Sequence, residues 1–131
     1  ILDLLDLPLI PYQHRAGLSL KNILNGEEKN LNRQALYFHL PHYHHINSMG
    51  PSGAIRTGKY KLIEVFETGE VELYDLENDM GENTNLTSSN HLLAKKILSQ
   101  LHEWQKKSGV DMPTLNTGYS PEKDIRTKHK F

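Results

Sequence analysis

The sequence of 131 residues contains no cysteine, which excludes disulfide bonds and thiolate metal sites within it. It has no run of about 18 apolar residues, the length that a membrane-spanning helix needs. It also opens without the basic segment and apolar stretch of a signal peptide. These absences leave the compartment unknown, and they predict no transmembrane helix in this chain.

Neither sign of charge is in excess, because 15 basic residues face 16 acidic ones for a net charge of -1. A strong positive charge is the usual electrostatic basis for binding nucleic acids and anionic membranes. We therefore expect neither nucleic acid nor a membrane as a partner. The length and the 37% hydrophobic content predict one modest core.

The first 34 residues contain little regular pattern. Leucine and isoleucine at positions 1, 2, 4, 5 and 7 predict the end of a short helix, which Pro8 and Pro11 stop. Residues 12–32 are polar and irregular, except for one helical turn around Ile23 that Gly26 closes. This part is expected to be mostly irregular.

Four segments rich in aromatic and branched residues predict short strands at 35–40, 54–57, 59–66 and 71–76. Gly58 and Gly69 lie in the turns that separate the last three, which indicates two successive hairpins. Charged residues alternate irregularly with the apolar ones. The segments therefore predict an antiparallel meander with one face solvated or only partly covered.

An amphipathic helix is predicted after the helix-capping residues 88–90. Its apolar stripe consists of Leu93, Ile97, Leu101 and Trp104, and Gly109 is expected to end it. The fold class is thus α+β, with a small antiparallel sheet of about four strands packed against a C-terminal helix. The segments at both ends are irregular, and residues 119–131 are predicted to form a charged, mobile tail.

Two stretches resemble signatures of the C-terminal part of sulfatases, the arylsulfatase-like enzymes of the alkaline phosphatase superfamily. They are residues 72–86, ELYDLENDMGENTNL, and the preceding residues 53–63, GAIRTGKYKLI. Residues 17–26 and the segment 112–116, MPTLN, are similar to other parts of the same region. The resemblance thus extends over nearly the whole chain.

The resemblance implies a C-terminal fragment of a sulfatase, an enzyme that hydrolyses sulfate esters. Such enzymes use a formylglycine, made from the first residue of a C/S-x-P-x-R motif, and usually a calcium ion. The sequence lacks that motif. No catalytic or metal-binding residue is therefore assigned here, and calcium and formylglycine are expected only in the full-length enzyme.

The resemblance also implies domain boundaries within the chain and the partners that it contacts. Residues 1–34 correspond to the end of the larger domain, residues 35–118 to the C-terminal subdomain, and residues 119–131 to the tail. The expected partners are the N-terminal catalytic domain of the same sulfatase and a sulfated small molecule or saccharide. A periplasmic or secreted location is expected by resemblance alone.

Four histidines lie within seven residues at the end of the first predicted strand: His39, His42, His44 and His45. Sulfatases with a similar H-x-P-H-Y segment place it at the mouth of the active site, so the resemblance implies that His39 and His42 bind substrate. Imidazole suits this role, because it donates hydrogen bonds to sugar hydroxyls or sulfate oxygens. Two other interpretations are histidines that cap strand ends or face water, and a transition-metal site.

Two further sets of charged residues have simpler interpretations. Asp75, Glu77 and Asp79 alternate like calcium ligands, but the sixth and twelfth positions of that loop are not glycine and glutamate. We expect Asx turns there instead. Arg56, Lys59 and Lys61 lie around a hairpin turn, where exposed basic residues usually discourage edge pairing rather than bind anions.

One alternative from a different functional class remains open. The chain would then be a free-standing binding module that uses the histidine-rich loop for a metal or a sulfated glycan. A further alternative is a purely structural subdomain with incidental histidines.

Overall fold

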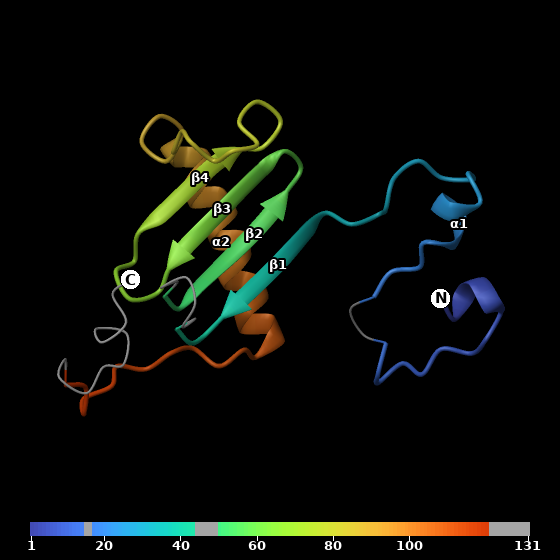
Figure 1. Ribbon diagram of the computed structural model, residues 1–131, viewed down its shortest axis with the longest axis horizontal. Coiled ribbons are helices and arrows are strands. Elements are labelled where there is room, and N and C mark those ends of the chain that lie inside the picture. Colours follow the sequence, from blue (N-terminus) through green and yellow to red (C-terminus); the bar gives the residue numbers. More distant parts are fainter. Residues whose placement is uncertain (15–16, 44–49, 121–131) are drawn as a thin grey trace, which may run out of the picture. The chain divides into compact units, whose positions relative to one another are not determined.

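The computed structural model describes residues 1–14, 17–43 and 50–120. The chain divides into two compact units, Ile1–Arg33 and Gln34–Phe131 (Figure 1). The predicted mobile tail lies outside the described residues from position 121 onward.

The second unit contains a four-stranded sheet in the order β1-β2-β3-β4, with every neighbouring pair antiparallel. The strands are Ala35–Leu40, Ser52–Thr57, Tyr60–Val65 and Val71–Asp75. Glycines with positive φ angles, Gly58 at 54° and Gly69 at 72°, form the two predicted hairpin turns. The predicted meander is confirmed.

Strand β2 begins two residues before the predicted start, at Ser52. Serine and glycine are poor strand formers, so local propensity gives no signal for these two positions. The pairing of Gly53 with His39 on one side and Glu64 on the other extends the strand. Neighbouring strands therefore override the propensity of this segment.

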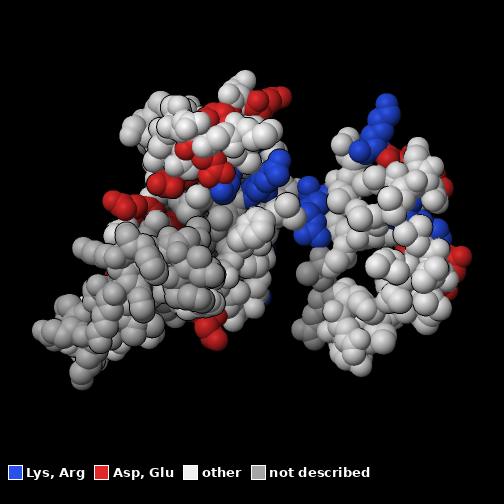
Figure 2. Space-filling model, in the orientation of Figure 1, with Lys and Arg blue, Asp and Glu red and all other residues white. Residues whose placement is uncertain are grey.

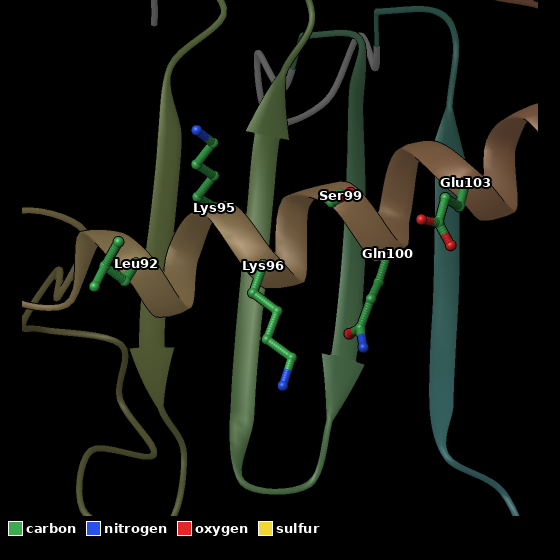
Figure 3. A pocket seen from close by; sticks show the side chains of 6 residues that line it. All are labelled: Leu92, Lys95, Lys96, Ser99, Gln100 and Glu103. Atoms are coloured by element: carbon green, nitrogen blue, oxygen red, sulfur yellow. The ribbon is translucent and has the colours of Figure 1, made fainter.

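Helix α2, His91–Ser108, crosses one face of the sheet from β4 to β1 (Figure 3). Its apolar stripe meets the sheet in a buried core of Ile55, Leu62, Leu73, Ala94, Ile97 and Leu101. Trp104 lies at the edge of this core and stacks on Tyr37, with ring centroids 4.8 Å apart and planes 5° apart. The α+β class is confirmed.

The two ends of α2 are fixed differently. Gly109 has the left-handed conformation, φ 60°, that the sequence predicts for the C-terminal cap. Asn90 is the N-cap residue, but its side chain makes no capping hydrogen bond. Instead, its backbone N–H donates to the carbonyl of Leu86 at 2.8 Å. The segment before the helix therefore holds this end.

The opposite face of the sheet has no helix over it among the described residues (Figure 1). It carries apolar side chains from all four strands, and Phe38 and Leu36 on β1 are 57% and 39% exposed. Tyr74, on the same face of β4, is only 8% exposed. The part of this face that lies on β1 is thus the most open.

The turns after β4 are held by carboxylate and amide side chains. Asp75 accepts a hydrogen bond from the backbone N–H of Glu77 at 3.1 Å, which confirms the predicted Asx turn. Asp79 accepts one from the N–H of Thr84 at 2.8 Å. Asn85 accepts from the N–H of Leu73 at 3.2 Å and so ties the segment back to β4.

The first unit contains a short 3₁₀ helix, η1, Asp3–Leu5, and one helical turn, α1, Lys21–Leu24. The helix predicted at the start is only this 3₁₀ turn, because Asp6 takes a left-handed conformation, φ 51°, directly after it. So short a segment has too few hydrogen bonds to offset helix nucleation. None of the described residues of this unit is buried.

Replacing Leu62 by alanine tests the core. Leu62 is fully buried and pairs with both Ile55 and Leu73. We expect Leu62→Ala to lower the free energy of unfolding by about 2–5 kcal/mol, because it leaves a cavity. The measurement is urea denaturation followed by circular dichroism. Leu92→Ala, at a position 73% exposed, is the control and should cost less than about 0.5 kcal/mol; equal losses in both variants would contradict this core.

Acid stability should depend on Asp79. Hydrogen bonds from the backbone N–H groups of Asn83 and Thr84 hold the pKa of its carboxyl below the usual value. This contribution is complete above the unfolded pKa, near 4, and is lost as the pH falls through the lower folded pKa. Asp79→Asn should therefore destabilise the protein more at pH 7 than at pH 3 in urea denaturation. Glu103→Gln is the control, and a pH-independent effect of Asp79→Asn would refute this role.

Candidate functional site

The predicted histidine segment lies where β1 ends. His39 is the penultimate residue of the strand and His42 follows it, whereas His44 and His45 lie outside the described residues. The structure therefore locates the two predicted substrate-binding residues, which differ sharply in their surroundings.

The side chain of His39 lies on the face of the sheet that α2 covers. Its Nε2 atom is 2.9 Å from the backbone carbonyl oxygen of Asp111, beyond the end of α2. A carbonyl oxygen only accepts, so Nε2 carries a proton and donates. The ring also lies against Phe66, with centroids 5.3 Å apart. His39 thus joins the end of β1 to the segment that follows α2.

His42 is exposed and belongs to the connection between β1 and β2. The two described ends of this connection approach each other, because a Cβ atom on Gly50 would lie 3.7 Å from the ring of Tyr43. His42 therefore presents an accessible imidazole from a connection whose ends are close together. Such a group is able to bind a polar ligand at neutral pH as donor or acceptor.

Two of the three basic residues around the first hairpin turn, Lys59 and Lys61, pair with carboxylates of the same unit. Lys59 Nζ is 2.7 Å from Asp75, and this hydrogen bond is the main reason that the pKa of Lys59 is raised. Lys61 Nζ is 2.6 Å from Glu82, and both side chains are about 30% exposed. Figure 2 shows acidic and basic side chains next to one another on this unit. These two lysines are poorly placed to bind sulfate.

The part of the chain that the structure describes offers no group of three or more histidine, cysteine or carboxylate residues able to hold a metal. Its helices include none that is long and apolar enough to cross a bilayer. One shallow depression lies on the outer face of α2 (Figure 3). All six residues that line it come from that single helix, so it is a shallow groove between side chains of one helix and not a binding pocket. They are Leu92, Lys95, Lys96, Ser99, Gln100 and Glu103.

Sequence reasoning missed Gln105, the one polar residue among the buried ones described. It lies four residues after Leu101 and thus continues the buried stripe of α2. That spacing was the available signal. A polar residue at the end of an apolar stripe is easily assigned to solvent, and only the packing against β2 shows otherwise.

Comparison with known proteins gives consistent results. The family model for the C-terminal region of N-sulphoglucosamine sulphohydrolase matches residues 1–108. A sulfatase from Formosa agariphila is 32% identical over 115 residues, which cover 79% of this chain and 21% of that protein. The chain thus spans about a fifth of the length of this relative.

Solved structures share the fold. A putative sulfatase from Bacteroides thetaiotaomicron has a TM-score of 0.73 at 23% identity, over 92% of this chain and 26% of its own. A second protein, solved with its substrate D-glucosamine-2-N,6-O-disulfate, has a TM-score of 0.62 at 28% identity. That alignment covers 80% of this chain and 22% of the other.

The family match extends over most of the chain, and the meander and crossing helix agree with the solved sulfatases. The chain therefore belongs to the N-sulphoglucosamine sulphohydrolase C-terminal family and is a C-terminal sulfatase subdomain.

Proposed function

We propose that this chain completes a sulfatase by packing on the enzyme's catalytic domain and by contributing to the rim of its substrate pocket. The observation that carries the packing is the apolar face of the sheet that α2 leaves open, where Phe38 is 57% exposed. Apolar side chains gathered on one face commonly mark an interaction surface. The rest of the enzyme is the occupant that we assign to it, because the chain covers only 21% of its relative.

The first unit supports the same proposal. Many of its large apolar side chains are exposed, including Ile1 at 92% and Leu5 at 63%, and it has no buried residue among those described. A segment without a core does not offset the entropy of ordering its backbone. Contact with the larger domain would bury these side chains.

The residues of this chain do not fit calcium or formylglycine. It has no cysteine and no C/S-x-P-x-R motif, and its described residues form no cluster of metal ligands. We therefore assign the nucleophile and the metal to the part of the enzyme outside this chain. Sulfate ester hydrolysis is the activity of the whole enzyme in this proposal, and the chain alone is inactive.

For the pocket rim, we propose His42 as the residue that touches substrate, because its ring is accessible. His39 was predicted to share this role, and its bond to the carbonyl of Asp111 favours holding the loop in place. A sulfated saccharide is the proposed substrate class. The support is the 28% identical protein whose solved structure contains a disulfated glucosamine.

The purified chain should hydrolyse no sulfate ester, because it lacks a nucleophile. The assay is release of sulfate from a chromogenic aryl sulfate and from a sulfated glucosamine. The full-length enzyme, assayed in parallel, is the positive control. Turnover by the 131-residue chain that persists after repurification would refute the assignment of chemistry to the missing part.

Alanine substitutions in the full-length enzyme separate the two histidines. His42→Ala should raise the KM for a sulfated saccharide about tenfold without changing the melting temperature, since one hydrogen bond to a charged ligand is lost. His39→Ala should also lower the melting temperature, because its ring is packed inside. His91→Ala, at an exposed position on α2, is the matched control. A KM for His42→Ala equal to that of this control would show that His42 does not contact the substrate.

A further inference from the structure

Two buried polar atoms at the β1 end of the sheet have no hydrogen-bond partner among the described residues. They are Nδ1 of His39 and Nε2 of Gln105. Gln105 is only 7% exposed, so its amide is inside the protein. Leaving a buried donor or acceptor unpaired is unfavourable, and such groups are rare in folded proteins.

Both residues are neighbours of Gly53. His39 is its partner in the β1–β2 register. A Cβ atom on Gly53 would lie 2.9 Å from Nε2 of Gln105 and 3.0 Å from the ring of Phe66. Phe66 in turn packs against the ring of His39. The absence of a side chain at Gly53 therefore leaves room for the Gln105 amide beside His39.

The two atoms are chemically complementary. Because Nε2 of His39 donates to the carbonyl of Asp111, Nδ1 of the neutral ring is an acceptor. The Gln105 amide nitrogen is a donor with no acceptor. No direct hydrogen bond joins the two atoms in this structure. We propose that one buried water bridges the Gln105 amide to Nδ1 of His39, and that Gln105 is a positioning residue for the loop that carries His42.

The residues around His39, Gly53 and Phe66 hold both ends of the connection between β1 and β2. His39 precedes the last residue of β1, and Gly53 is the second residue of β2. The N–H of Phe66 also donates to the carbonyl of Pro51 at 2.9 Å. Fixing the tautomer of His39 fixes its bond to Asp111 and hence the start of the loop. The link to catalysis depends on the proposed contact of His42 with substrate.

Nitrogen-15 NMR of the histidine rings tests the hydrogen bond in the 131-residue chain. The native ring of His39 should carry its proton on Nε2 alone. Gln105→Glu keeps the shape, but its ionised carboxylate only accepts hydrogen bonds and adds a negative charge near the ring, so His39 should also gain a proton on Nδ1 at pH 7. Gln100→Glu, on the exposed side of the same helix, is the matched control and should change nothing. If His39 kept its native signals in Gln105→Glu, the proposal would be wrong.

Gln105→Met covers the case in which the glutamate variant does not fold. It keeps the length of the side chain without a donor, so the Nδ1 resonance should move toward that of an unbonded ring nitrogen. An unchanged resonance would overturn the proposal.

Kinetics of the full-length enzyme separate this proposal from the preceding one. Gln105→Met should raise KM several-fold and leave kcat within about twofold, as expected for a displaced binding residue. A changed Nδ1 signal with unaltered kinetics would support the hydrogen bond and show that the loop does not contribute to substrate binding. Altered kinetics for His42→Ala with an unchanged Nδ1 signal in Gln105→Met would support the contact of His42 with substrate and refute the link between Gln105 and His39.

Discussion

The contact between the stripe of α2 and the centre of the sheet is the interaction on which the rest of the second unit depends. Ile55, Leu62 and Leu73 occupy adjacent positions on β2, β3 and β4, and the helix covers them with residues spaced three and four apart. Burial of these side chains is the main favourable term available to so small a unit. It also sets the crossing of α2 over β1, where Trp104 stacks on Tyr37.

Polar contacts around this core direct the chain between its elements. Lys59 pairs with Asp75, and Lys61 pairs with Glu82, which lies 21 residues later. Ion pairs that remain in contact with solvent contribute little to stability, so the value of these two is mainly geometric. They hold the segment after β4 against the hairpin, and Asn85 leads that segment toward α2. The result is a rigid support from which the β1–β2 connection extends.

The elements with strong periodicity were predictable, whereas contacts between distant residues were not. The hairpin glycines, the stripe of α2 and Gly109 each carry a local signal, and the structure confirms them. The Lys61–Glu82 pair depends on which segments lie side by side, so no local pattern reports it. For the burial of Gln105 the only local signal was its spacing of four residues from Leu101. His39 and His42 look equivalent in sequence, but strand alternation turns His39 inward.

The order of the strands has a consequence for how the chain reaches its native state. Each strand pairs with the next along the sequence, and α2 follows directly, so most native contacts join residues close in the chain. Low contact order of this kind favours rapid folding, since little loop-closure entropy opposes each pairing. Residues 41–51 form the longest connection between paired strands. Their closure is therefore the costliest step of the meander, and the pairing of β1 should come late.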